Sequence, residues 1–178
     1  MNASRGLLGI VLGLGLSVLA GCGWAPLYAD RETGPADLEL RAIKVDPIAE
    51  RIGQRLALAL RESLNPDGAP APQRYRLSTL LTVSRADLGL QQTGLGSRGK
   101  LDATASITLR DIRTGAPLLS ASSHAVESFD IVANEYAAVV AEDDARTLAV
   151  EELRRDIVTQ LTLFLQRRAA ETPTLRKP

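Results

Sequence analysis

The sequence predicts an α+β protein: a two-layer sandwich in which two helices cover one face of a four-stranded sheet. Three observations carry this prediction. The length of 178 residues suits one domain. Stretches that alternate apolar and polar residues indicate strands with one face in water. Two longer stretches with an apolar residue at every fourth position indicate amphipathic helices. Along the chain, the expected order is β-α-β-β-β-α, after a cleaved lipoprotein signal peptide.

The first strand and the first helix are expected within residues 38–64. Residues 38–45 alternate apolar and polar side chains at their start, which predicts a strand. Asp46 and Pro47 then favour a helix start, as an N-cap acid followed by proline at the first helical position. The apolar stripe of this helix consists of Ile48, Ile52, Leu56, Leu60 and Leu64.

Three further strands and a long helix complete the predicted domain. Residues 75–84 and 101–110 alternate most regularly, and residues 117–128 form a fourth strand with weaker alternation. A helix is expected from Asn134 to about Arg168, with a length of roughly 50 Å at 1.5 Å per residue. Its apolar stripe consists of Ala141, Ala145, Ala149, Leu153, Ile157, Leu161 and Leu165.

The N-terminus has the pattern of an export signal. A single charge, Arg5, precedes an uncharged apolar run at residues 6–21, which is short for the alternative of a transmembrane anchor. The run ends in Leu-Ala-Gly-Cys, which resembles the bacterial lipobox, where the signal is cut before a cysteine that carries lipid. Lipidation would also account for an odd cysteine in an exported protein. We therefore expect cleavage between Gly21 and Cys22 and a covalent lipid on Cys22.

The predicted organisation has four parts. Residues 1–21 are the signal peptide, residues 22–36 are the lipidated cysteine and a tether, residues 37–168 are the α+β domain, and residues 169–178 are a disordered tail. Two or more acyl chains make membrane anchoring stable. Inner-membrane retention signals commonly place Asp after the cysteine. Gly23 therefore favours a lipid-anchored protein on the periplasmic side of the outer membrane, if the source is Gram-negative.

Composition excludes several classes of partner and cofactor. The chain has 21 basic and 21 acidic residues and only 3% aromatics. A nucleic-acid partner is therefore not expected, because such proteins usually carry a basic surplus and stacking aromatics. One His and one Cys cannot form a Cys/His metal cluster or an intramolecular disulfide. We expect no metal and no cofactor other than the lipid on Cys22.

The sequence patterns that resemble catalytic or cofactor-binding motifs have structural explanations. The glycines of residues 94–99 match G-x-G-x-x-G, but a strand is expected after them, whereas a dinucleotide site needs a helix. His124 would need Ser122 or Ser123 as a nucleophile, and no nucleophile elbow is present. Adjacent carboxylates diverge by about 100° on a helix, so we expect them to be solvated and to pair with arginines three or four residues away. These carboxylates are Glu142, Asp143, Asp144, Glu151 and Glu152, and the arginines are Arg146, Arg154 and Arg155.

Two features could serve binding. Arg98 and Lys100 follow the glycine-rich loop, and Arg110 and Arg113 flank the next turn. Such cations could meet phosphates of a lipid or saccharide, or could simply be solvated. The long helix also carries a second set of apolar residues, so either it is deeply packed or part of it faces a partner protein. This set consists of Val139, Val140, Leu148, Val150, Leu163 and Phe164.

Four segments, taken in order along the chain, match the motifs of one protein family. Residues 22–28 read Cys-Gly-Trp-Ala-Pro-Leu-Tyr, which looks like the opening of the LptE family of lipopolysaccharide-assembly lipoproteins. Residues 46–54 resemble its first helix, residues 75–77 the start of its second strand, and residues 134–146 the opening of its last helix. The resemblance spans residues 22 to about 165, and the order and spacing of the segments make it specific.

The resemblance implies a function by binding. Members of the family are α+β sandwiches anchored in the outer membrane, which Cys22 would do here. They sit inside and support the large β-barrel LptD, and that complex inserts lipopolysaccharide into the outer leaflet. No catalysis is implied. Lipopolysaccharide contacts in the family are attributed to basic residues, but no motif fixes their positions in this sequence. Arg98 and Lys100 are therefore candidates from loop position and charge alone.

Two other functions remain as alternatives. A pilotin-like or other envelope lipoprotein could deliver a different outer-membrane complex, and the identity of the partner would distinguish it. A periplasmic hydrolase would predict that His124→Ala abolishes an activity.

Overall fold

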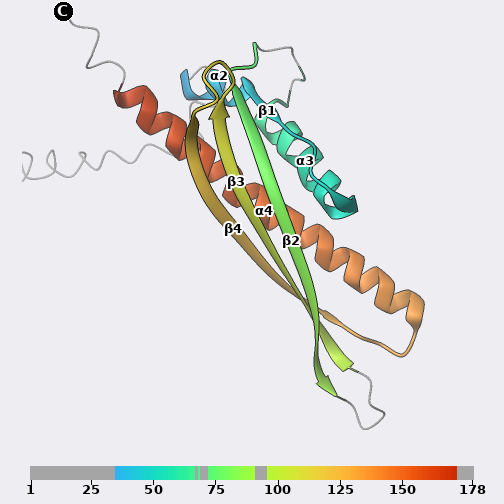
Figure 1. The fold of residues 1–178 in the computed structure, drawn as a ribbon. Helices are drawn as coiled ribbons and strands as arrows, with labels where there is room; N and C mark the ends of the chain where they lie inside the picture. Colours follow the sequence, from blue (N-terminus) through green and yellow to red (C-terminus); the bar gives the residue numbers. More distant parts are fainter. Residues whose placement is uncertain (1–34, 67, 69–71, 91–95, 172–178) are drawn as a thin grey trace, which may run out of the picture. The chain divides into compact units, whose positions relative to one another are not determined.

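A computed structural model describes residues 35–66, 68, 72–90 and 96–171 of the chain. The predicted signal peptide, Gly21 and Cys22 therefore lie outside the described residues. Seven elements follow one another, as Figure 1 shows: α2 (Pro35–Arg41), β1 (Ile43–Val45), α3 (Glu50–Leu64), β2 (Tyr75–Leu90), β3 (Gly96–Asp111), β4 (Pro117–Asp130) and α4 (Glu135–Glu171).

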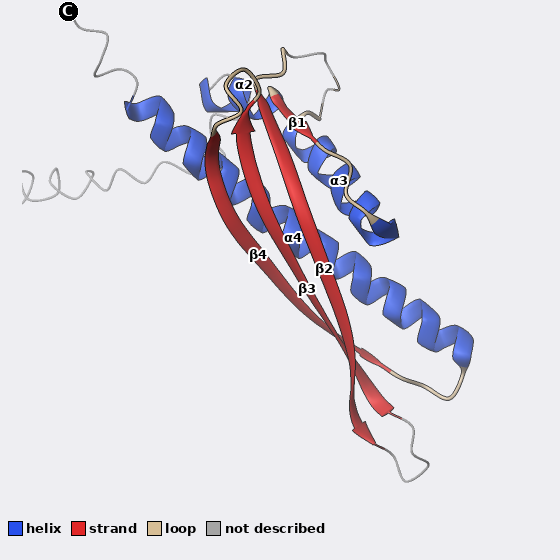
Figure 2. Cartoon of the chain, in the orientation of Figure 1, coloured by secondary structure: helices blue, strands red, loops and turns tan. Residues whose placement is uncertain are grey.

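The sheet has four strands in the order β1-β2-β3-β4, as Figure 2 shows. β1 runs parallel to β2, and the other neighbours are antiparallel. A parallel pair needs a long crossover, and α3 supplies it between β1 and β2. The two antiparallel pairs are joined by hairpins. The α+β class and the four-stranded sheet are confirmed.

The core lies between one face of the sheet and the two long helices. Leu56 and Leu60 of α3 and Leu153 of α4 have no exposed surface, and they belong to the same buried cluster as the inward residues of the strands. α4 lies against β4 and β3, while α3 lies against α4 and β1. The prediction that both helices cover one face is therefore confirmed. The inward strand residues of this cluster include Leu77, Leu101, Ala103, Ala105, Ile107 and Leu109.

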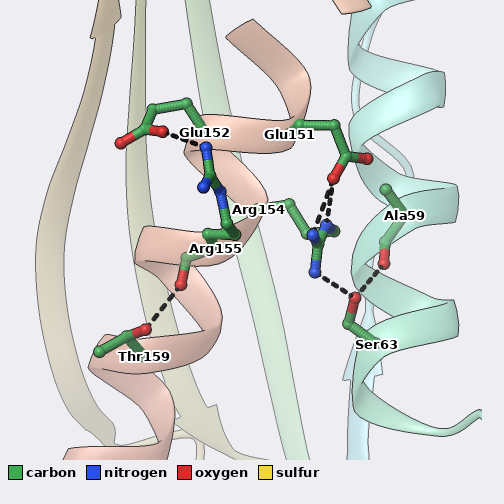
Figure 3. A network of polar contacts seen from close by, with 7 residues as sticks. All are labelled: Ala59, Ser63, Glu151, Glu152, Arg154, Arg155 and Thr159. Atoms are coloured by element: carbon green, nitrogen blue, oxygen red, sulfur yellow. Dashed lines mark hydrogen bonds and ion pairs between the residues drawn. The ribbon is translucent and has the colours of Figure 1, made fainter. Parts of the chain in front are cut away.

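Polar contacts fix the two helices to each other (Figure 3). The guanidinium of Arg154 bonds Glu151 on its own helix and donates to the Ser63 hydroxyl of α3 over 3.1 Å. That hydroxyl in turn donates to the carbonyl of Ala59. Farther along the same pair of helices, Arg55 forms an ion pair with Asp143 at 3.0 Å. The helices are thus held by directional contacts as well as by apolar packing.

The segment predicted as the first strand is mostly helical. α2 covers Pro35–Arg41, and only Ile43–Val45 pair with β2. The prediction of a strand over residues 38–45, and of a tether reaching residue 36, was wrong here. Proline at the first position suits a helix. Contacts with β2 then hold the helix, since the Tyr75 hydroxyl donates to the Glu39 carboxylate over 2.6 Å.

The next helix begins at Glu50, not at Asp46. The backbone N–H of Asp46 donates to Leu77 O over 3.0 Å, and its carboxylate accepts from the Ser78 hydroxyl over 2.9 Å. Asp46 therefore extends the pairing with β2 and cannot cap the helix. Ile48 instead folds over the first turn, so close to Gly53 that a Cβ there would lie 2.6 Å from its methyl carbon.

β2, β3 and α4 extend beyond the ends that the sequence predicted. β2 continues to Leu90 and β3 begins at Gly96, so both strands run farther toward their connection than the alternating segments predicted. α4 begins at Glu135, one residue after Asn134, whose side-chain oxygen accepts the N–H of Ala137. It ends at Glu171, three residues beyond the predicted domain end. No helix among the described residues is both long enough and apolar enough to cross a membrane.

Candidate functional site: the open face of the sheet

The two predicted cations lie on the sheet face that the helices leave open. Residues 98 and 100 have the same parity on β3, opposite to the inward residues Leu101 and Ala103. Arg98 is exposed and lies in register with Leu88 of β2 and Asp130 of β4. The cations therefore lie where β3 begins, close to the β2–β3 connection.

Lys100 belongs to a cluster of three charged or titratable groups. Its ammonium lies 3.2 Å from one oxygen of Asp102, and the Nε2 of His124 lies 2.7 Å from the other. The hydrogen bond with His124, and then that with Lys100, hold the pKa of Asp102 below its ordinary value of 3.8. His124 was predicted to be hydrogen-bonded or solvated on a polar face, and this is confirmed.

Gly99 lies between the two cations and is closely packed on the opposite face of the sheet. Its own face is the inward one, where the ring of Phe129 lies so close that a Cβ would meet it at 2.3 Å. The guanidinium of Arg85 covers that ring at 5.6 Å from its centre, and it also reaches Glu142 of α4 at 3.6 Å. The last glycine of the G-x-G-x-x-G pattern is thus a packing glycine within β3, whereas the sequence predicted a hairpin connection at residues 94–99 with the strand after it.

The two candidate cations differ in their availability. Lys100 already neutralises Asp102, whereas no ion pair of Arg98 is found among the described residues. An exposed guanidinium can bind a phosphate through two parallel hydrogen bonds. Arg98 is therefore the stronger candidate for an anionic ligand. Arg110 and Arg113 lie at the opposite end of β3, and the Arg110 guanidinium donates to Gly115 O over 3.3 Å.

The candidate catalytic residues do not converge. Ser123 is buried on the inward face, whereas Ser122 and His124 are exposed on the open one. His124 contacts Asp102, and no hydroxyl hydrogen bond to its ring is found in the described part of the chain. The predicted helical pairs are present, since Glu142 bonds Arg146, Glu151 bonds Arg154 and Glu152 bonds Arg155. Within the described residues, no three potential metal ligands come together.

The second apolar set of the long helix divides into two groups. Val150 is buried and Phe164 is partly buried against the core. Val139, Val140, Leu148 and Leu163 are exposed, and they alternate with the charged residues of α4. Deep packing thus accounts for Val150 and Phe164, and the prediction that the exposed group faces a partner stays a prediction.

A hollow of about 710 Å³ lies between β1 and the C-terminal end of α3. Arg41, Lys44 and Arg61 line it together with Glu62. Arg41 and Arg61 each lie in the last turn of a helix, where cations complement the exposed carbonyl groups. The Arg61 guanidinium also donates to Val45 O over 3.3 Å. These cations therefore have a structural role, and the open sheet face is the better candidate site.

The sequence left two docking surfaces possible, a polar outer sheet face and an exposed part of the long helix, and did not show which polar residues lie together. Alternation predicted a wet face on each strand separately, but only the register places the polar residues of three strands side by side. That face is rich in hydroxyl groups. The described residues thus form a two-layer α+β sandwich with one sheet face left open by the helices.

Solved structures share this fold. A lipoprotein from Caulobacter crescentus CB15 aligns with a TM-score of 0.61 and 23% identity, covering 74% of this chain and 96% of that one. A minor lipoprotein from Acinetobacter baumannii aligns with a TM-score of 0.55 and 17% identity, covering 68% and 90%. At these identities the likeness concerns the fold alone. No curated protein sequence matches the chain significantly.

The family is shown by sequence. The family model described as LptE, lipopolysaccharide-assembly, matches residues 40–165, which is most of the chain and includes the four described strands, α3, and α4 as far as residue 165. The protein belongs to the LptE family. The resemblance seen in the sequence is therefore confirmed, and the protein is a lipopolysaccharide-assembly protein of that family.

Proposed function

We propose that this protein is an outer-membrane lipoprotein that partners and plugs an LptD-like β-barrel and so assists the assembly of lipopolysaccharide into the outer leaflet. The family match over residues 40–165 carries the proposal. The open, polar sheet face supports a role in binding, because it offers surface without a catalytic constellation. In this role the protein is not an enzyme.

The anchor is part of the same proposal. The signal peptide is removed between Gly21 and Cys22, and a diacylglyceryl group and a further acyl chain on Cys22 hold the mature protein on the periplasmic side of the outer membrane. Burial of lipid contributes about 0.8 kcal/mol for each CH₂ group, so two or more chains give stable attachment.

Purification from the outer membrane tests the partnership. The full chain, with an affinity tag at its C-terminus, is expressed in its own host and extracted in mild detergent. We expect a large β-barrel of the LptD kind to co-purify in a one-to-one ratio, identified by mass spectrometry. Stoichiometric capture of a secretin or another outer-membrane complex would instead support the pilotin-like alternative.

We further propose that Arg98, with Lys100 beside it, contacts the phosphates of lipopolysaccharide. The exposed guanidinium of Arg98 supports this role, and Lys100 lies two residues away on the same face of β3. Arg98→Glu with Lys100→Glu should weaken lipopolysaccharide binding about tenfold or more, measured by titration of the purified complex with labelled lipopolysaccharide. Arg110→Glu with Arg113→Glu, at the other end of the strand, is the matched control. Unchanged binding in the first variant would contradict the assignment.

A further inference from the structure

The open sheet face contains an uncharged region between two charged ends. In register across β2, β3 and β4 lie three rows: Thr82–Thr104–His124, Leu80–Ser106–Ser122 and Ser78–Thr108–Ser120. Seven of these nine side chains carry a hydroxyl group, and all nine are exposed or half-buried. We call these nine residues the hydroxyl patch.

Charged residues bound the hydroxyl patch on both sides along the strands. Asp102 and Lys100 follow at one end, and Arg76 and Arg110 follow at the other. The helix side of the domain is different, because ion pairs such as Arg155–Glu152 and Arg146–Glu142 follow α4 there. The centres of protein interfaces are depleted in charged residues, since charges are costly to remove from water. The sheet face therefore suits docking better than the helix face.

The size of the face also suits docking. β2 alone presents outward residues from Arg76 to Leu88, a length of about 40 Å at 3.4 Å per residue, and three strands are about 14 Å wide. The whole open face, with its charged ends, thus has a footprint of about 550 Å², and the hydroxyl patch is its centre. A typical stable interface buries about 800 Å² on each partner, so the patch would be the centre of an interface that includes the surrounding face.

The chemistry of the face points to the kind of partner. Leu80 is 71% exposed in the middle row, but its neighbours across the strands are serines. A partner with a large apolar surface would leave these hydroxyl groups without hydrogen bonds. The hydrocarbon interior of a membrane would do the same. A polar protein wall can bond them directly or through water. The inward-facing side of an outer-membrane β-barrel is such a wall, because its lumen-facing residues are polar.

We propose that the hydroxyl patch, and not the exposed side of α4, is the surface by which this protein docks onto the polar inner wall of its β-barrel partner. This inference rests on the proposed partnership with a barrel and adds which surface makes the contact. The sheet face lies against the wall, and the charged helix side stays in water.

Two matched leucines test this assignment. Leu80 lies at the middle of the hydroxyl patch and is 71% exposed, while Leu148 lies on the outer side of α4 and is 57% exposed. Each is replaced by arginine in the tagged full chain, and the barrel that co-purifies per molecule is measured by quantitative mass spectrometry. We expect Leu80→Arg to lower the amount at least tenfold and Leu148→Arg to lower it less than twofold. Circular dichroism and thermal unfolding of both variants verify that they fold.

A second measurement adds no charge to the surface. A photo-crosslinking amino acid replaces Ser106 in the hydroxyl patch or Thr159 on α4, and only the Ser106 position should form a crosslink to the barrel. If the native protein captures the barrel but Leu80→Arg captures it equally, or both arginine variants lose it alike, the docking face is wrong. If the native protein captures no barrel, the proposed partnership itself fails and the docking face fails with it.

Discussion

At the scale of single residues, the cluster around Asp102 shows how the open face is organised electrostatically. His124 and Lys100 each bond one oxygen of the same carboxylate. Because these bonds favour the ionised form, the pKa of Asp102 is lowered. The stability that this carboxylate contributes is therefore present above its unfolded pKa and is lost as the pH falls through its folded pKa.

Replacement of His124 should shift this titration. The bond with His124 is the largest cause of the lowered pKa, so His124→Phe should raise the pKa of Asp102 toward 3.8. Lys100→Met, which removes the second cause, should raise it by a smaller amount. Carboxyl chemical shifts followed by NMR between pH 2 and pH 6 measure both values. A larger rise in Lys100→Met than in His124→Phe would contradict this order of causes.

On β3, Gly99 is the position at which an added methyl group should lower the free energy of unfolding most. A Cβ would meet the ring of Phe129, which is 6% exposed and covered by Arg85. Gly99→Ala should therefore lower the free energy of unfolding by about 1–3 kcal/mol through overpacking. Chemical denaturation measures the loss. In the background of Phe129→Ala the same change should cost little, and an equal cost there would show that the ring is not the cause.

At the scale of elements, the sequence was most informative where the periodic pattern was long. α3, α4 and the antiparallel strands were predicted with their inward faces, because one face of each is buried over many residues. The segment before them is short, and in residues 38–41 alternation fits a strand as well as a helix. The contact of Glu39 with Tyr75, which helps to decide for the helix, joins residues 36 positions apart and has no local signal.

The site was less predictable than the fold, because contacts between residues far apart in the sequence leave no local signal. Arg98 and Lys100 could be selected by charge and by their place near a loop. Their difference could not be predicted, because the pairing of Lys100 with Asp102 depends on which strand face each side chain occupies. The hydroxyl patch depends on the register of three strands, and the hydroxyl residues of one strand carry no information about their cross-strand neighbours.

The long helix allows a matched test of which apolar residues hold the fold. Leu153 is fully buried, whereas Leu148, five residues earlier, is 57% exposed. Leu153→Ala should lower the free energy of unfolding by about 2–5 kcal/mol, because it removes buried side-chain atoms and leaves a cavity. Leu148→Ala should change it by less than about 0.5 kcal/mol. Urea denaturation compares the two, and similar losses would mean that α4 packs with a different face.

At the scale of the whole molecule, the protein combines a folded domain with a proposed anchor, and the two parts should be separable. Among the described residues, the buried cluster extends from Leu40 to Leu165 and joins both long helices to the sheet. The family match also begins at residue 40, after Cys22. Folding should therefore survive the loss of the lipid, whereas membrane attachment should not.

Replacement of the single cysteine tests this separation. In the first variant the signal segment is kept and Cys22 is replaced by Ala. In the second variant residues 1–21 are exchanged for a signal peptide that the general signal peptidase cuts, and Cys22 is again replaced by Ala.

We expect the native protein in the outer-membrane fraction, with the mass of a chain that begins at Cys22 and carries acyl chains. The first variant should remain an uncut precursor, because the lipid-dependent cut needs the thiol. The second should be released as a folded periplasmic protein with an unchanged unfolding temperature. A native protein that retains residues 1–21 without lipid would contradict the anchor, and a second variant that fails to fold would contradict the independence of the domain.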